Sequence, residues 1–187
     1  MTDYIIHTED SAPDASKPLI QSATRAYGFL PNLLAVQAES PALLEGYMTL
    51  SGIFDKTRLS ATERQIILMT NNRLNGCGYC MAAHTSLSQM ANVPDDVIEA
   101  LRNGTEIADP RLEALRVFAT RVNETRGWVE QRDLDALFAA GYTRETAFDV
   151  ILGTSLKVMS NYTNHIAQTP VDEAFQPNAW TSGEKAA

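Results

Sequence analysis

The sequence predicts an all-α protein. Apolar residues recur with helical spacing along nearly the whole chain of 187 residues. Stretches in which apolar and polar residues alternate, as in a half-buried strand, are scarce, and β-hairpin signals are lacking. The single Asn75-Gly76 pair is flanked by helical patterns and is interpreted as a helix break. We therefore expect roughly eight to ten helices.

Capping residues, prolines and glycines mark where these helices begin and end. Ser60 and Glu63 have the spacing of a capping box, in which each side chain accepts a hydrogen bond from the other residue's backbone N–H. In chain order, we expect helices at 18–27 (opened by Pro18, stopped by Gly28), 31–39 (opened by Pro31), from 41 (capped by Ser40), from 60 to near 75, then 78–91, 94–102, 110–126, 131–140 (stopped by Gly141) and 143–167 (capped by Thr143).

Length and charge limit the classes of protein that fit. The length suits one domain, which we place at 1–187 with a core at about 18–170 and polar tails at both ends. The net charge of −8 and the lack of a basic stripe argue against nucleic-acid binding. No apolar run approaches the roughly 18 residues of a membrane span, and the polar, acidic N-terminus does not resemble a signal peptide. We expect a cytoplasmic protein.

The two cysteines of the chain, Cys77 and Cys80, carry the chemistry that the sequence suggests, together with His84. On a helix these three side chains fall within a sector of roughly 60°, so they can touch. One thiolate of a Cys-x-x-Cys pair can attack a substrate while the other thiol resolves the product as a disulfide. A position in the first turn of a helix favours the thiolate, and His84 can accept a proton from Cys80 or stabilise its thiolate as imidazolium. Gly76 and Gly78 would leave room for a partner to approach the sulfurs.

A metal site is the main alternative to redox chemistry at this pair. Cys77, Cys80 and His84 could supply three zinc ligands, with Glu63 or His165 as the fourth, but the second Cys/His pair that is usual in structural zinc sites is missing. Haem attachment needs a histidine where Met81 stands. We therefore expect neither a metal nor a cofactor.

At these residues the sequence resembles the alkylhydroperoxidase D-like branch of the carboxymuconolactone decarboxylase family, in its peroxidase-related subgroup. The matching residues run from Leu59 through Ile67 and from Asn75 through His84. Weaker support comes from Gly28-Phe-Leu-Pro-Asn-Leu33, Ser40-Pro41 and the segment from Asn161 to Ala167.

The resemblance implies a helical fold that assembles into homo-oligomers, commonly trimers or hexamers, and a thiol-dependent reduction of small hydroperoxides without metal or flavin. By position, Cys80 would be the attacking thiol. Cys77 would be the resolving thiol, nearer to solvent and open to a dithiol reductant such as a lipoylated or thioredoxin-like protein. His84 would belong to a proton relay with a glutamate.

The expected relay glutamate lies twelve residues before the first cysteine, and here that position is Gln65. Glu63 lies two residues earlier, about 200° away around the helix, and has the competing capping role. Either Glu63 reaches the thiols through a local shift, or His84 and a water move the proton. We keep Glu63 with Cys80, Cys77 and His84 as predicted catalytic residues.

The sequence thus predicts an antioxidant thiol peroxidase. Two alternatives remain open: a decarboxylase or ring-opening enzyme acting on a small lactone, as elsewhere in the family, and a thiol redox sensor without turnover.

Overall fold

The computed structural model describes residues 4–182, and within that range it contains helices and loops but no strand. The helices are α1 (Lys17–Tyr27), α2 (Asn32–Gln37), α3 (Pro41–Phe54), α4 (Ala61–Leu74), α5 (Gly78–Met90), α6 (Asp95–Asn103), α7 (Pro110–Glu124), α8 (Gln131–Ala139) and α9 (Arg144–Ala167), with short 3-10 helices η1 (Asp14–Ser16) and η2 (Glu173–Asn178). The all-α prediction is confirmed, and each expected helix lies within a few residues of its predicted range.

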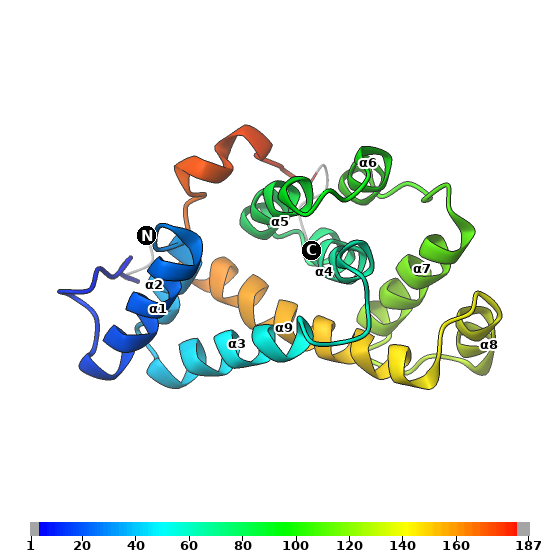
Figure 1. The fold of residues 1–187 in the computed structure, drawn as a ribbon, viewed down its shortest axis with the longest axis horizontal. Helices are drawn as coiled ribbons and strands as arrows, with labels where there is room; N and C mark the ends of the chain where they lie inside the picture. The colour runs from blue at the N-terminus through cyan, green and yellow to red at the C-terminus, as the bar shows by residue number, and fades with distance from the viewer. Residues whose placement is uncertain (1–3, 183–187) are drawn as a thin grey trace.

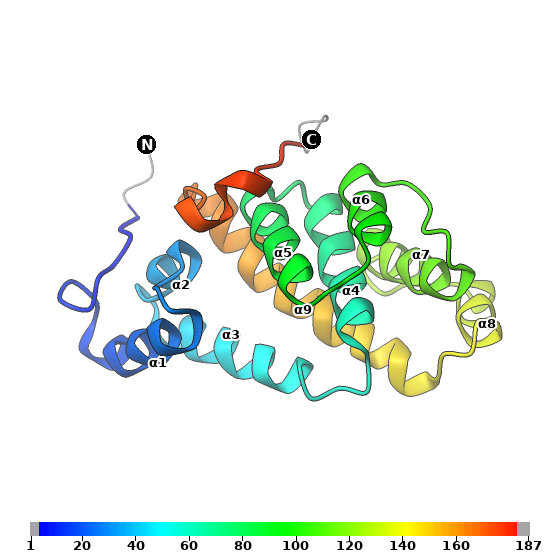
Figure 2. The ribbon, with the colours of Figure 1, turned by 45° about the horizontal axis from the view of Figure 1, so that its top comes forward.

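Helix α9 is the longest element and runs along the long axis of the molecule beside α3 (Figure 1). Helices α1 and α2 lie at one end and α8 at the other, while α4 packs against α5, α6, α7 and α9 in the middle (Figures 1 and 2). At Gly153, an added Cβ would lie 2.7 Å from Cγ2 of Ile67 and 2.9 Å from Cζ of Phe54. This close approach lets α9 pack tightly against both α4 and α3.

Local signals explain how α4 and α5 begin. The capping box is present, with Ser60 N donating to Oε2 of Glu63 at 2.7 Å and Glu63 N donating to Oγ of Ser60 at 3.2 Å. Helix α4 ends at Leu74, and Gly76 then adopts a left-handed φ of 66°, which glycine allows without steric cost. The chain reverses there, so α5 returns beside α4 with Cys77 as its N-cap residue.

The buried apolar residues form two clusters. The larger one joins α4, α6, α7 and α9 around Ile66, Met69 and Leu115. The smaller one joins α1, α2 and the start of α5, and it contains both cysteines. It also contains Ala12 and Phe175, so the core extends beyond the predicted limits of 18–170.

The C-terminal segment, residues 170–180, packs across α5, where the sequence suggested only a polar tail (Figure 2). Phe175 contacts the rings of Phe29 and Tyr79. Arg102 of α6 holds the end of the segment by donating to the backbone oxygens of Asn178 and Ala179. The end of the predicted C-terminal tail, residues 183–187, lies outside the described residues. Within residues 4–182, none of the helices is both long and apolar enough to cross a lipid bilayer.

Candidate thiol site

Both cysteines lie at the start of α5 and are buried, each with 1% of its surface exposed. Cys77 is the N-cap residue, and Cys80 follows in the first turn, where free backbone N–H groups and the helix dipole favour an anion. The two thiols are not joined by a disulfide. Cys77, which the sequence predicted to be open to a reductant, is as little exposed as Cys80.

The face of α9 that points at the cysteines is polar. It carries Lys157, Ser160, Asn161 and Asn164, which repeat at helical spacing and are all buried. Asn164 directs its amide Nδ2 at both sulfurs, 3.2 Å from Sγ of Cys80 and 3.8 Å from Sγ of Cys77. These residues supply hydrogen-bond donors and a positive charge to the cysteine pair inside an apolar cluster.

Two other asparagines, Asn72 and Asn75, fix the position of Asn161 beside the cysteines. Asn161 donates to Oδ1 of Asn72 at 3.0 Å and accepts from Nδ2 of Asn75 at 2.8 Å. Asn72 in turn donates to the backbone oxygen of Cys80 at 3.2 Å. A chain of side-chain amides thus ties α4 and α9 to the first turn of α5, and each buried polar group in it gains a partner.

This environment shifts the pKa values of the two thiols in opposite directions. Burial opposes ionisation of Cys80, yet the Cys77 thiol and the charge of Lys157 bring the pKa of Cys80 down to about 5. Hydrogen bonds from Ser160 and Asn161 act in the same direction. The hydrogen bond that Cys77 donates to Cys80, together with burial, holds the pKa of Cys77 above its ordinary value. Of the two thiols, Cys80 is therefore the one that ionises first, and Cys77 is the one that keeps its proton.

His84 lies one turn after Cys80 and is held on both sides. Its Nε2 lies 2.9 Å from Nζ of Lys157, and its Nδ1 lies 2.9 Å from Oε1 of Gln65. An ammonium only donates hydrogen bonds, so Nε2 is the acceptor and Nδ1 carries the proton, which it donates to the Gln65 oxygen. Burial and the charge of Lys157 hold the pKa of His84 well below its ordinary value. The imidazolium form considered from the sequence is therefore disfavoured.

Glu63 lies elsewhere, in a separate pocket with Arg111 and Tyr142. Its Oε1 is 2.7 Å from Nη1 of Arg111, and its other oxygen accepts from Ser60 in the capping box. Burial alone would raise the pKa of Glu63, but the hydrogen bonds with Ser60 and the charge of Arg111 lower it. Gln65 is the residue of α4 that contacts His84, so the structure does not bring Glu63 together with the other predicted site residues.

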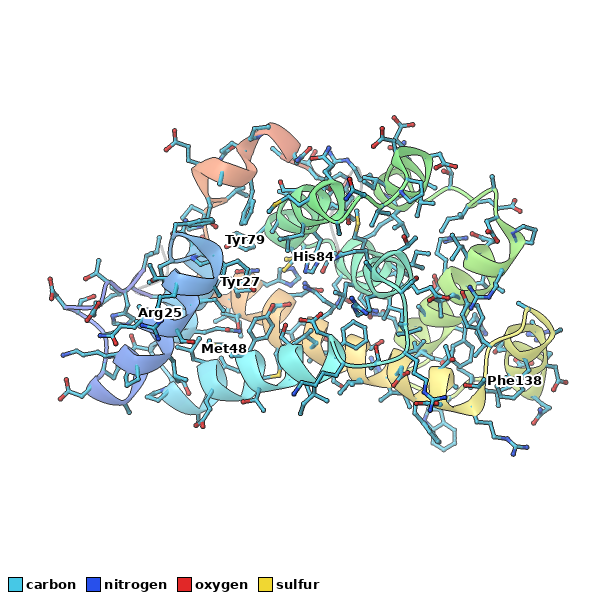
Figure 3. The ribbon with its side chains drawn as sticks, in the orientation of Figure 1. Arg25, Tyr27, Met48, Tyr79, His84 and Phe138 are labelled. Atoms are coloured by element: carbon cyan, nitrogen blue, oxygen red, sulfur yellow. The ribbon has the colours of Figure 1, made fainter. Side chains whose placement is uncertain are left out.

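A cavity of about 50 Å³ opens beside Cys80. Cys80, His84 and Lys157 form its polar part, and the rest of its wall is aromatic and aliphatic. Tyr27, Tyr79 and His84 surround the interior region between α5 and the end of the molecule formed by α1 and α2 (Figure 3). The site is thus a small, mostly apolar cavity with the sulfur of Cys80 and the side chains of His84 and Lys157 at one side.

The C-terminal segment forms part of the wall of this cavity. The hydroxyl of Tyr79 donates to Oδ2 of Asp172 at 2.5 Å, and Phe175 lines the cavity. Gly78 leaves no room for a partner, contrary to the sequence-based expectation, since a Cβ there would lie 2.8 Å from the backbone oxygen of Trp180. The C-terminal segment thus covers the start of α5 at Gly78.

Sequence reasoning missed the α9 residues of the site. Lys157, Ser160, Asn161 and Asn164 come from a helix about 80 residues further along the chain. One signal could have found them: four polar residues at helical spacing between two apolar stripes of the same helix. In the described part of the chain, no three His, Cys, Asp or Glu side chains are grouped so that they could hold a metal ion.

The fold and the thiol site define an all-helical protein with a buried Cys-x-x-Cys pair. Residues 41–120 match the model of the carboxymuconolactone decarboxylase family, which confirms the resemblance predicted from the sequence. No match is found among curated proteins.

Solved structures share the fold over almost the whole chain. An alkylhydroperoxidase AhpD core, peroxidase-related protein from Ralstonia eutropha JMP134 aligns with a TM-score of 0.82 and 22% identity, covering 93% of this chain and 94% of that one. A peroxidase-related protein from Silicibacter sp. TM1040 aligns with a TM-score of 0.77 and 20% identity, covering 92% of each chain. The debrominase Bmp8 aligns with a TM-score of 0.79 and 17% identity in a complex with 2,3,4-tribromopyrrole, covering 95% of this chain and 96% of that one. The chain thus has the AhpD-like fold.

Proposed function

We propose that this protein is a cytoplasmic, thiol-dependent hydroperoxide reductase with an antioxidant role. The observation that supports the proposal is that the two buried thiols have pKa values shifted in opposite directions. Cys80 is held as a thiolate by its donors and by Lys157, while Cys77 beside it keeps its proton. A thiolate is the nucleophile that peroxides oxidise, and a neighbouring thiol resolves the product.

In the first step the Cys80 thiolate attacks the terminal oxygen of a hydroperoxide, ROOH. The S–O bond forms and the O–O bond breaks, which yields Cys80 sulfenic acid and an alkoxide that takes up a proton to leave as the alcohol. Cys77 then attacks the sulfenic sulfur, so that a disulfide forms and water leaves. A dithiol donor, which we propose is a lipoylated or thioredoxin-like protein, restores both thiols by disulfide exchange.

The cavity limits the substrate. A water molecule needs roughly 10–15 Å³ of such a volume. The cavity of about 50 Å³ therefore admits hydrogen peroxide or the head of a small alkyl hydroperoxide. We infer that turnover falls as the alkyl group grows, because a larger group needs displacement of the aromatic wall.

Peroxide consumption with excess dihydrolipoamide tests the proposal. We expect multiple turnovers in the native protein and none in Cys80→Ser or Cys77→Ser. In Cys77→Ser, Cys80 should still form a sulfenic acid that dimedone traps, whereas Cys80→Ser should form none. Unchanged turnover in both variants would overturn the proposal, and a dimedone adduct on Cys77 of Cys80→Ser would reverse the two roles.

The same assays separate the remaining alternatives. Ring opening or decarboxylation of a lactone that survives alkylation of both thiols would favour the decarboxylase-type function, which the family match also supports. A disulfide that forms with peroxide but never turns over with any dithiol would favour a redox sensor.

We also propose that the chain forms homo-oligomers, as trimers or hexamers, through the outer face of α9. Phe148, Ile151, Val158, Tyr162 and Ile166 are exposed along that face, beside a groove of about 410 Å³. Packing of this stripe against another copy of the chain would remove its apolar side chains from water. Light scattering should show a smaller assembly for Tyr162→Glu, and a monomeric native chain would contradict the proposal.

A further inference from the structure

Lys157 is an unusual residue to find inside a core. It lies in the second half of α9 with 0% of its surface exposed. Within the described residues, none of the carboxylates forms an ion pair with it, and its Nζ donates a hydrogen bond to Nε2 of His84 at 2.9 Å. An ammonium removed from water costs several kcal/mol unless an opposite charge lies close by.

The Cys80 thiolate is the anion that balances this charge. Lys157 lines the cavity together with Cys80 and His84, and its charge acts on Cys80. The other titratable groups that face this region are Cys77 of α5 and the tyrosines Tyr27, Tyr47 and Tyr79, which are neutral when protonated. The carboxylate of Asp172 lies behind Tyr79 and accepts a hydrogen bond from its hydroxyl. Among the side chains that line the cavity, the reduced site therefore pairs one anion, at Cys80, with one cation, at Lys157.

Oxidation removes the anion, so the cation loses its partner. When Cys80 enters a disulfide with Cys77, the thiolate charge is gone, and an ammonium at position 157 would be buried without compensation. Over the same reaction the leaving alkoxide needs a proton. His84 is a poor source, because its one proton is donated to Gln65 and its other nitrogen accepts from Lys157. The proton of Cys77 is consumed in the second step, when water leaves.

We propose that Lys157 is the catalytic acid of the site, and that its protonation follows the redox state of the cysteine pair. It is an ammonium beside the thiolate and a neutral amine beside the disulfide. This inference rests on the proposed thiol chemistry and adds the source of the proton. In the first step Cys80–S⁻, ROOH and Lys157–NH₃⁺ become Cys80–SOH, ROH and Lys157–NH₂. Reduction by a dithiol returns one proton to Cys77 and one to Lys157.

Proton uptake during oxidation tests this assignment in the native protein. The reduced protein is oxidised at pH 7 with stoichiometric diamide in weak buffer, and a pH indicator reports the protons exchanged. Diamide becomes a hydrazine by gaining two hydrogens, of which Cys77 supplies one. If Lys157 supplies the other, no net proton is taken from solvent. Uptake of one proton per disulfide would overturn the assignment.

Lys157→Arg is the matched variant, because a guanidinium keeps the charge but does not give up its proton. We expect its Cys80 to remain a thiolate, with unchanged absorbance at 240 nm and an iodoacetamide rate close to native, since alkylation needs no acid. Oxidation by diamide should now take up one proton. Oxidation by hydrogen peroxide should slow by about 100-fold or more, the usual contribution of a general acid. An unchanged peroxide rate in a folded Lys157→Arg protein would contradict the role.

Lys157→Met removes the charge as well, and there we expect the 240 nm absorbance at pH 7 to disappear. The diamide measurement needs no peroxide activity and no variant. Failure of peroxide turnover with zero proton uptake would reject the proposed function alone, whereas peroxide turnover with uptake of one proton would reject the role of Lys157 alone.

Discussion

Oε1 of Gln65 accepts a hydrogen bond from Nδ1 of His84 across 2.9 Å, and this contact fixes which nitrogen of the imidazole carries the proton. A glutamine oxygen can hold that tautomer, but it brings no negative charge that would stabilise an imidazolium. Gln65, in place of the expected glutamate, therefore leaves His84 neutral. The cation of this site is Lys157 instead.

Gln65→Glu should reverse that arrangement. A carboxylate beside Nδ1 favours the charged ring, so we expect the pKa of His84 to rise from its present value well below 6.5. NMR titration of the ring resonances, assigned with His84→Asn, would measure the shift, and Gln65→Met serves as the uncharged control. Identical titrations of His84 in the native protein and in Gln65→Glu would contradict the prediction.

His84 also affects the stability of the fold in acid. The unfolded chain takes up a proton at His84 near its ordinary pKa of about 6.5, and the folded chain does not. The free energy of unfolding should therefore decrease as the pH falls below about 6.5, and less so in Gln65→Glu. Urea unfolding at pH 5 and pH 7.5 would show the difference.

Asn164 offers a second test, since its amide donates toward both sulfurs. A hydrogen bond to a charged group is worth about 1.5–3 kcal/mol, which corresponds to about one or two pKa units. We expect Asn164→Leu to raise the pKa of Cys80 by that amount, so that the iodoacetamide rate at pH 6 drops while the rate at pH 9 changes little.

Ser155→Ala, on the exposed side of the same helix, is the control for Asn164→Leu. Its rate profile should match that of the native protein. A native-like pH profile in Asn164→Leu would mean that the amide does not stabilise the thiolate.

Much of the fold could be predicted because its signals are local. The capping box at Ser60 and Glu63, the Ser40 cap and the break at Gly76 each depend on residues within a few positions, and all three lie where the sequence placed them. The position of Cys80 in the first turn of α5 is set by local sequence in the same way. Tertiary contacts do not change any of these features.

The rest of the site depends on contacts between distant segments. In the sequence, Lys157 cannot be told from an exposed charged residue of a long helix. Its burial results from the packing of α9 against α5. The covering of Cys77 depends likewise on the C-terminal segment, whose polar sequence gave no sign that Asp172 would accept a hydrogen bond from Tyr79. Glu63 had two possible roles in the sequence, and the structure shows the capping role.

Glu63→Gln should weaken the fold without changing the thiols. Glutamine can still accept the hydrogen bond from Ser60 N but loses the ion pair with Arg111, whereas Glu63→Ala loses both and should cost about 0.5–2 kcal/mol in the free energy of unfolding. Because the folded pKa of Glu63 is lowered, its charge stabilises the fold above the ordinary carboxyl pKa and ceases to do so as the pH falls through the folded value. Urea unfolding measures the loss. An altered iodoacetamide rate of Cys80 in Glu63→Gln would instead indicate that Glu63 takes part in a proton relay with the thiols.

Gly78→Ala tests whether the C-terminal segment controls access to Cys77. The added methyl group would lie 2.8 Å from the backbone oxygen of Trp180, so the segment must shift away from the start of α5. We expect large disulfide reagents and protein dithiols to react several-fold faster than with the native protein, while the small reagent iodoacetamide reacts at nearly the native rate. Gly52→Ala on α3 is the matched control, because an added Cβ there meets no heavy atom within 4 Å. Equal acceleration in both variants would trace the effect to a general change in the helices. No acceleration in Gly78→Ala would mean that the reductant reaches the sulfurs by another path, with the segment in place.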